Sequence, residues 1–238
     1  MKNYEILDLD LEKRHLISFV GAGGKSTSMD ILAKEFKDMG KKVLVTTTTV
    51  IFHQQHIDND EFVLGELNYD LIPLKGSITL YGRSMDDGKI RGVSEDEVIE
   101  IYNRGIFDII LVEADGARMK PIKAPANHEP VVPNITTMTI GVIGLDAIGK
   151  PLDEEHVHRA EILGSVLNVD LPHYVDVNDI VKLASSEDGL FKRTSGRKVL
   201  FLNKADNIEL LHLGEVIRRQ LLEKGIRDVY VGERGKLC

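Results

Sequence analysis

The sequence reads Gly21-Ala22-Gly23-Gly24-Lys25-Ser26-Thr27 directly after the apolar run 16–20, and this stretch decides the fold. A strand, a glycine turn and a Lys-Ser-Thr that opens a helix form the layout of a phosphate-binding loop. Glycines lack Cβ, so the backbone can approach an anion closely, while amides and the positive end of the helix dipole face it. We therefore expect these residues to hold a polyphosphate, with Lys25 near its β- and γ-phosphates and Ser26 or Thr27 on Mg²⁺.

Two alternatives to a phosphate loop have to be weighed. The loop is shorter than the usual pattern, which places a glycine where this chain has Phe19. Residues 21–26 also fit part of the dinucleotide-binding fingerprint, but that site needs an acid at the end of the second strand. The second strand ends instead in the threonines 46–49. Together with the lysine after the last glycine, this favours phosphate binding over a dinucleotide site or a glycine turn without a ligand.

Composition limits the classes of protein to which the chain can belong. It has 238 residues, 42% hydrophobic and 29% charged, with a net charge of −8. This balance is typical of a globular protein and argues against a general nucleic-acid or anionic-membrane surface. The single cysteine, Cys238, allows no intrachain disulfide and no cysteine zinc cluster. We expect a cytoplasmic protein that binds neither nucleic acid nor a membrane.

Strand and helix patterns alternate along the chain. The predicted strands are 13–20, 43–47, 77–81, 89–93, 108–113, 137–143, 198–202 and 229–231, and the predicted helices are 27–39, 94–103, 153–167, 178–185 and 208–224. Alternation of this kind indicates an α/β fold with a mostly parallel central sheet and right-handed crossovers. We expect a single three-layer P-loop NTPase domain over 1–238, with an inserted segment at about 53–93 and a proline-rich loop at about 117–134.

Acidic residues follow the apolar strand 109–112 at the edge where ligands of such folds bind. Glu113 and Asp115 are candidates to hold Mg²⁺ or to orient a nucleophilic water, and Gly116 could turn its N–H toward the γ-phosphate. Thr48 or Thr49, at the end of the second strand, is a further candidate for Mg²⁺ or the γ-phosphate. The alternative is a pair of solvated acids that begin a loop.

The tetrapeptide Asn203-Lys204-Ala205-Asp206 follows the strand 198–202. Many GTPases read guanine with this pattern, because the aspartate accepts two hydrogen bonds that adenine cannot donate. Lys204 would lie along the base, and Asn203 would tie neighbouring loops. The alternative is a polar turn in which Asp206 caps the next helix.

Cations gather in the loop after the acidic strand end. Arg118, Lys120 and Lys123 could neutralise phosphoryl charge or bind an anionic second substrate, and His128 with Glu129 could serve acid–base chemistry. An exposed polar loop is the alternative. His156 and His158, at the start of the predicted helix, are two residues apart and make a poor metal pair. With Arg159 they could form a helix-start cluster that binds phosphate or a partner molecule, and the alternative is a solvated helix end.

Five motifs together resemble the YqeC family, described as accessory proteins of selenium-dependent molybdenum hydroxylases. The motifs are Val20 to Thr27, Val45 to Thr49, Val112-Glu113-Ala114-Asp115-Gly116-Ala117-Arg118, Lys123-Ala124-Pro125-Ala126-Asn127-His128-Glu129-Pro130 and His158-Arg159. The resemblance implies a role in maturation of such a hydroxylase. A wider similarity, carried by Glu113-x-x-Gly116 and Asn203-Lys204-x-Asp206, is to GTPases that serve metal-enzyme maturation. The chain lacks the His/Cys-rich tract that those proteins often use to carry metal.

These patterns predict Mg²⁺-dependent binding and hydrolysis of a nucleoside triphosphate, GTP rather than ATP, in maturation of a molybdenum hydroxylase. One alternative is a small-molecule kinase or ligase that moves the γ-phosphoryl to an anionic acceptor. Another is a non-catalytic scaffold with a vestigial nucleotide site. The molybdenum hydroxylase or its cofactor-handling proteins are the partners that the family resemblance implies.

Overall fold

The computed structural model describes residues 1–52, 58–70 and 72–237, so the predicted insertion at about 53–93 lies partly outside the described residues. Within the described residues, none of the helices has both the length and the apolarity needed to cross a bilayer.

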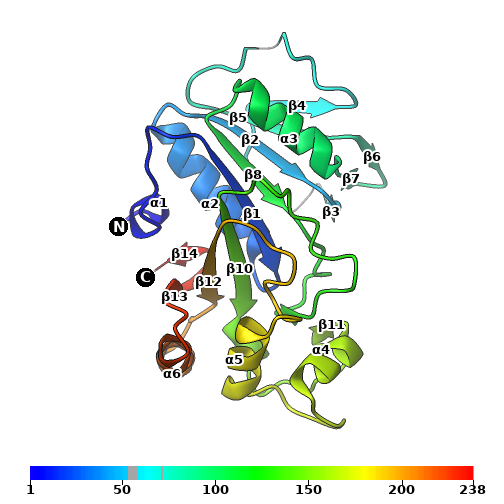
Figure 1. The fold of residues 1–238 in the computed structure, drawn as a ribbon, viewed down its shortest axis with the longest axis vertical. Helices are drawn as coiled ribbons and strands as arrows, with labels where there is room; N and C mark the ends of the chain where they lie inside the picture. Colours follow the sequence, from blue (N-terminus) through cyan, green and yellow to red (C-terminus); the bar gives the residue numbers. More distant parts are fainter. Residues whose placement is uncertain (53–57, 71, 238) are drawn as a thin grey trace.

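One large sheet forms the centre of the molecule (Figure 1). Within the described residues its strand order is β14-β13-β12-β10-β1-β8-β2-β5-β4. Every pairing is parallel except that of β13 with β14. The strands are β1 (His15–Gly21), β2 (Lys42–Thr47), β4 (Glu61–Leu64), β5 (Ser77–Gly82), β8 (Ile109–Glu113), β10 (Met138–Gly144), β12 (Arg197–Asn203), β13 (Val229–Glu233) and β14 (Lys236–Leu237).

The position of β1 in the sheet sets the position of the glycine loop. Strand β1 lies between β8 and β10, with Phe19 opposite Glu113 and Gly21 opposite Val142. Parallel strands end at the same edge, so the loop after β1 emerges beside the acidic end of β8. Ligands of open α/β sheets bind at this edge.

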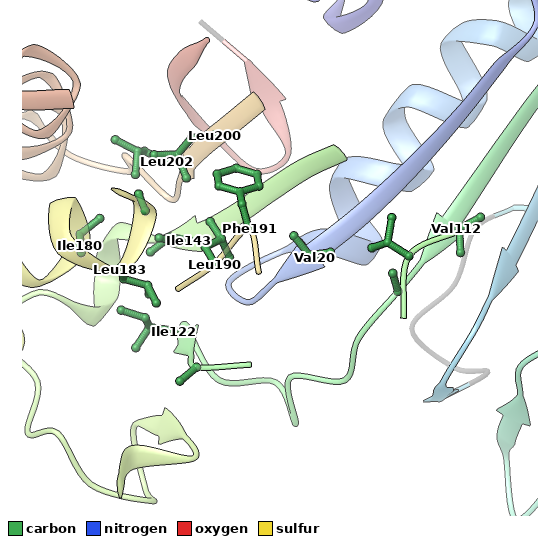
Figure 2. Packing of buried hydrophobic residues seen from close by; sticks show 14 of the residues in the cluster. Val20, Val112, Ile122, Ile143, Ile180, Leu183, Leu190, Phe191, Leu200 and Leu202 are labelled. Atoms are coloured by element: carbon green, nitrogen blue, oxygen red, sulfur yellow. The ribbon is translucent and has the colours of Figure 1, made fainter. Parts of the chain in front are cut away.

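Helices cover both faces of the sheet. They are α1 (Asn3–Ile6), α2 (Lys25–Asp38), α3 (Glu95–Arg104), α4 (Ala160–Leu167), α5 (Val177–Ser185) and α6 (Ile208–Glu223). Alternate residues of one strand face opposite sides. Ile17 and Phe19 of β1 belong to the core under α2, whereas Leu16 and Val20 belong to the core under α3 to α6. Figure 2 shows part of this second core, where Leu200 and Leu202 of β12 meet residues of α5. The expected three-layer α/β architecture with a mostly parallel sheet is confirmed.

Two small sheets complete the fold. Strands β3 (Val50–Phe52), β6 (Ser84–Asp86) and β7 (Lys89–Arg91) form an antiparallel sheet, and β9 (Ile122–Lys123) pairs in parallel with β11 (Val157–His158). Of the segment predicted as an insertion, β4 and β5 extend the central sheet, while β6 and β7 belong to the antiparallel sheet.

The helix predicted over 153–167 is wrong in its first part. The observed helix α4 begins at Ala160, because residues 157–158 pair with β9 and Arg159 has a left-handed φ of 67°. The loop predicted over 117–134 is correspondingly interrupted by β9. The helix predicted over 94–103 is confirmed: the Ser94 side chain accepts a hydrogen bond from the Glu97 amide, and Gly105 ends the helix in the left-handed conformation.

Candidate functional site

The glycines of the loop are required by close backbone contacts. Gly21, Gly23 and Gly24 have φ values of 91°, 84° and 126°. A Cβ on Gly23 would lie 2.2 Å from the amide nitrogen of Gly144, and one on Gly24 would lie 2.2 Å from Nδ2 of Asn203. The loop backbone therefore sits directly against the ends of β10 and β12, in a conformation that side chains other than hydrogen do not permit.

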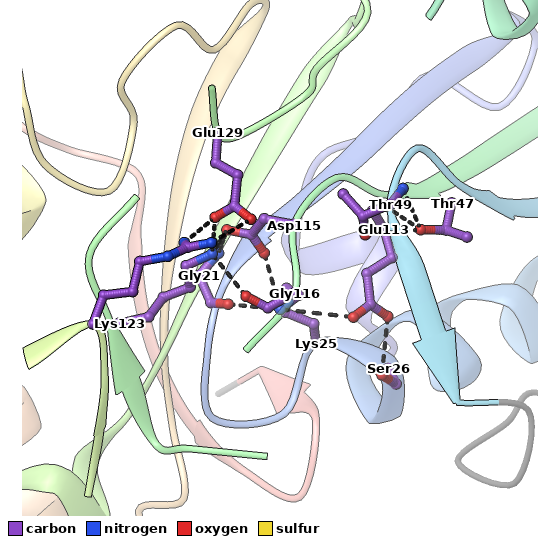
Figure 3. A network of polar contacts seen from close by, with 11 residues as sticks. Gly21, Lys25, Ser26, Thr47, Thr49, Glu113, Asp115, Gly116, Lys123 and Glu129 are labelled. Atoms are coloured by element: carbon purple, nitrogen blue, oxygen red, sulfur yellow. Dashed lines mark hydrogen bonds and ion pairs between the residues drawn. The ribbon is translucent and has the colours of Figure 1, made fainter. Parts of the chain in front are cut away.

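Lys25 is the first residue of α2, and its ammonium group is buried beneath the loop (Figure 3). The residue is only 4% exposed. Its Nζ donates to the carbonyl of Gly21 at 2.6 Å and lies 3.0 Å from Oδ1 of Asp115 and 3.7 Å from Oε1 of Glu113. Burial works to lower the pKa of Lys25, but the Asp115 and Glu113 carboxylates outweigh it and the pKa is raised. The site thus holds a permanent positive charge at a helix N-terminus.

Glu113 is the last residue of β8 and faces the start of α2. Its Oε2 accepts a hydrogen bond of 3.0 Å from the hydroxyl of Ser26. Burial raises the pKa of the Glu113 carboxyl, and the opposing effects of Lys25 and Ser26 do not cancel the rise. A hydroxyl and a carboxylate are oxygen ligands of the kind that Mg²⁺ prefers.

Asp115 links the loop to a second buried lysine. Its Oδ2 accepts from the amide of Gly21 at 2.9 Å and lies 3.1 Å from Nζ of Lys123. Its Oδ1, which faces Lys25, is buried without a hydrogen bond from any described residue. Lys123 is 1% exposed and also donates to the carbonyl of Gly116 and to Glu129 Oε2, at 2.8 and 2.6 Å.

Arg159 ends this series of charges. Its guanidinium donates to both carboxylate oxygens of Glu129, with one of the two contacts at 2.9 Å. Burial works to raise the pKa of Glu129, yet the hydrogen bonds from Arg159 and Lys123 lower it to about 2. Lys25, Asp115, Lys123, Glu129 and Arg159 therefore form one chain of alternating buried charges, which we call the charge chain.

A cavity of about 790 Å³ opens above the loop. Part of its lining consists of residues 23–27 and Glu113, and another part, which we call the cationic wall, of residues 116–120 with His128, Glu129, His158 and Arg159. Residues 48–51, Val131 and Lys204 complete the lining. This volume is in the range of small-molecule binding sites.

The structure brings most of the predicted residues to this cavity. Those in its lining are Gly23, Gly24, Lys25, Ser26, Thr27, Thr48, Glu113, Gly116, Arg118, His128 and Lys204. Those outside it are Gly21, Ala22, Asp115, Lys123, Asn203 and Asp206. Gly21, Asp115 and Lys123 lie behind the lining, in contact with one another or with Lys25. Lys123 therefore supports the site from within the protein, whereas the sequence predicts that it neutralises phosphoryl charge or binds an anionic second substrate.

The tetrapeptide after β12 is divided between two environments. Asn203 is buried, donates to the carbonyl of Gly23 at 2.8 Å and accepts from the amide of Gly235 at 3.1 Å. Lys204 lines the cavity and donates to Asp146 at 2.7 Å, whereas Asp206 is exposed. The alternative of Asp206 as a helix cap is wrong, because the side chain of Asn207 caps α6.

The threonines after β2 are held against the acidic strand. The Thr47 hydroxyl donates to the carbonyl of Glu113 at 2.8 Å, and the Thr48 hydroxyl donates to that of Val131 at 2.7 Å. Thr48 and Thr49 both line the cavity. Because the Thr48 hydroxyl uses its hydrogen to donate to Val131, its oxygen can still accept from or coordinate a ligand.

The sequence left His158 and Arg159 open between a helix-start cluster that binds phosphate or a partner molecule and a solvated helix end. Both line the cavity because the pairing of β11 with β9 carries them there, with His158 opposite Lys123 in register. Burial, followed by the nearby cations Arg159, Lys123 and Arg118, lowers the pKa of His158 to about 4. Its imidazole is therefore neutral at pH 7. Two-residue strands carry no periodic pattern, so only the His-Arg pair itself could have pointed to this position.

The residues fit a nucleoside triphosphate with Mg²⁺. Residues 23–27 line the cavity, and the first-turn amides of α2 have no intrahelical acceptor. Among the residues that the structure describes, no group of three or more His, Cys, Asp or Glu side chains suits a metal ion. A cation here would instead use the Ser26 and Glu113 oxygens together with phosphate, as Mg²⁺ usually does.

Comparison with known proteins agrees with the motifs. A family model described as YqeC protein matches residues 17–161. The chain is also 29% identical over 233 residues to a protein of Escherichia coli (strain K12) named "Uncharacterized protein YqeC", with 96% of this chain and 91% of that protein covered. The matched region contains the glycine loop, the acidic end of β8 and the cationic wall.

We predict that Gly23→Ala destabilises the protein far more than Gly88→Ala. Both glycines have positive φ, at 84° and 67°, but a Cβ on Gly88 meets nothing within 4 Å. The strain of a left-handed alanine, about 1–2 kcal/mol, is common to both, so only Gly23→Ala adds the clash with Gly144. Urea denaturation measures both free energies of unfolding. Equal losses would show that the loop does not sit against β10.

We predict that Glu129→Gln lowers the free energy of unfolding by about 3–5 kcal/mol at pH 7, because it breaks a buried ion pair. The folded pKa of about 2 lies below the ordinary value of 4.5, so this contribution is complete above pH 4.5 and is lost as pH falls toward 2. The difference from wild type should therefore shrink over that interval. Glu100→Gln, in an exposed pair with Arg104, is the control and should cost about 0.5 kcal/mol or less. A difference that does not change with pH would contradict the assignment.

Proposed function

The chain belongs to the YqeC family, and from this premise we propose that it binds and hydrolyses a nucleoside triphosphate with Mg²⁺, GTP in preference to ATP, during maturation of a selenium-dependent molybdenum hydroxylase. The observation that carries the proposal is the Lys25 ammonium, buried at the start of α2 between the loop carbonyl and two carboxylates. A buried cation beside a glycine cradle and free helix amides is an arrangement suited to phosphate.

The phosphates would bind along residues 23–27. The Gly23 amide already donates to the Lys120 carbonyl, so the amides of 24–27 and the α2 dipole would supply the neutralisation, without reorganisation because the loop is already held by β10 and β12. Lys25 adds a full charge at the β- and γ-phosphates. An incoming phosphate would take over Lys25 from Asp115, which keeps the Gly21 amide and Lys123 as partners.

Ser26 and Glu113 are the side chains placed to hold Mg²⁺, with Thr48 nearby in the lining. When bound, Mg²⁺ would neutralise charge on the β- and γ-phosphates. Glu113 is also the carboxylate best placed to orient an attacking water, since its pKa is raised and Asp115 is already bonded to Gly21 and Lys123. Hydrolysis then breaks the bond between the γ-phosphorus and the bridging oxygen, and water supplies the new oxygen.

The preference for guanine rests on the segment after β12. Lys204 faces the cavity, and the carboxylate of Asp206 is exposed two residues further along. Among the described residues Asp206 has no hydrogen-bond partner, so it is free to accept from the guanine N1–H and amino group. The place in hydroxylase maturation rests on the family resemblance. The nucleotide would act there as a switch, ordering the loops that follow β2 and β8 until hydrolysis releases them.

We predict that Lys25→Met weakens Mg²⁺–GTP binding by about 100-fold or more, because the phosphates lose a charge-assisted contact. Lys25 also neutralises Asp115, so circular dichroism must first show that this variant folds. Ser26→Ala keeps that pair and should lower Mg²⁺-dependent hydrolysis by about tenfold or more. Lys34→Met, on the exposed part of α2, is the matched control. Isothermal titration and phosphate release give the two readouts, and wild-type values in both site variants would refute the proposal.

We predict that Asp206→Asn abolishes the preference for GTP over ATP and creates binding of xanthosine triphosphate. The amide donates where the carboxylate accepts, and xanthine presents the complementary carbonyl. The loss of GTP affinity should be about tenfold or more. Glu209→Gln, an exposed change in the first turn of α6, is the control. Competition binding with the three nucleotides measures the effect, and equal affinity of the parent protein for ATP and GTP would exclude guanine reading.

A further inference from the structure

The cationic wall contains polar side chains that the protein itself leaves unused. His158 is only 8% exposed and lines the cavity, yet its imidazole has no hydrogen-bond partner among the described residues. Arg118 and His128 also line the cavity without a hydrogen bond or ion pair to the described part of the chain. The ring nitrogens of His158 are not among the sealed, unpartnered atoms of the described residues, so they are accessible from the cavity that the residue lines and are available to a ligand.

Defined backbone contacts and conformations place the residues that carry two of these side chains, His158 and Arg118. The carbonyl of His158 accepts from the Ala124 amide, and β11 is in register with β9. Arg159 adopts a left-handed φ of 67°, and its guanidinium donates to both carboxylate oxygens of Glu129. Arg118 is left-handed as well, at 47°. Strained non-glycine backbone gathers at binding sites, where the surrounding structure maintains it.

The charge of the cavity favours an anion. Of the described side chains in its lining, five are cations and two are carboxylates, in a chain whose net charge is −8. Glu129 is already neutralised by Lys123 and Arg159. Lys204 is paired with Asp146 outside the lining, and Lys120 is bonded to a carbonyl. Arg118 is therefore the cation of the cationic wall that has no hydrogen-bond or ion-pair partner among the described residues.

His158 adds a directional donor next to that charge. Its pKa of about 4 makes the imidazole neutral at pH 7, so it donates one hydrogen bond through one ring nitrogen. An arginine with a neutral imidazole and a second histidine can bind a carboxylate or phosphate oxygen. These groups line the same cavity of about 790 Å³ as residues 23–27.

We propose that the cationic wall binds the oxyanion of a small second substrate, a carboxylate or a phosphate, through Arg118, His158 and His128. The inference rests on the proposed function, because it places this oxyanion in the same cavity as the γ-phosphate of a nucleotide held at residues 23–27. Arg159 is a positioning residue: it fixes Glu129 and the β11 segment, and thereby the ring of His158.

The test uses the full-length protein saturated with Mg²⁺ and a non-hydrolysable GTP analogue, so that the phosphate loop is already filled. Inorganic phosphate and malonate are then titrated separately by calorimetry. We expect at least one of the two to bind, and the identity of that probe distinguishes a phosphate from a carboxylate substrate. Arg118→Gln and His158→Gln should each weaken this binding by about tenfold or more, whereas Arg219→Ala, an exposed change on α6, should not alter it.

The two steps of the titration separate the two proposals. Arg118 is exposed, so its variant gives a result even if the buried His158 variant does not fold. Binding of the analogue without binding of either anion would overturn this inference and leave the proposed function intact. Anion binding that survives in the Arg118 variant would also overturn it. Failure of the analogue to bind the wild-type protein would overturn the proposed function and this inference together.

Discussion

The charge chain from Lys25 to Arg159 is the interaction on which the site depends. Each of its members is buried or half-buried, and an isolated buried charge is costly to remove from water. Here every ion has an opposite charge within 3.1 Å. Removing one partner of such a pair typically costs about 3–5 kcal/mol, because the other charge is left unpaired. The charge chain therefore connects α2, the end of β8, β9 and the start of α4 through continuous ion pairs.

A second constraint acts on the backbone of the glycine loop. The glycine loop lies so close to Gly144 and Asn203 that no side chain fits between them. The Asn203 side chain bridges the loop to Gly235 in the turn between β13 and β14. Neither contact involves a ligand, so the cradle has its shape before anything binds. Preorganised donors of this kind stabilise an anion without paying for rearrangement.

Local patterns were sufficient to predict the parts of the site that lie on long elements. The glycine loop between β1 and α2, and the acids after β8, follow from an apolar run and the residues directly behind it. The burial of Lys123 and its ion pairs with Asp115 and Glu129 could not be predicted from such a pattern. Prolines and cations in 117–134 favour an exposed loop, but the pairing of β9 with β11 buries Lys123 between Asp115 and Glu129. That pairing joins segments far apart in the sequence, and apolar residues at 157, 160 and 163 also suit a helix.

The two walls of the cavity share one set of charges, and this has a consequence for binding. Asp115 is shared by Lys25 and Lys123, and Glu129 by Lys123 and Arg159. An anion that takes Lys25 leaves Asp115 more dependent on Lys123, which in turn weakens the hold of Lys123 on Glu129. The Glu129 carboxylate then depends more on its ion pair with Arg159. Arg159 is also the residue that follows His158 and holds this segment to Glu129. Occupancy of one wall therefore changes the electrostatics of the other, and thermodynamic linkage requires the effect to be equal in both directions.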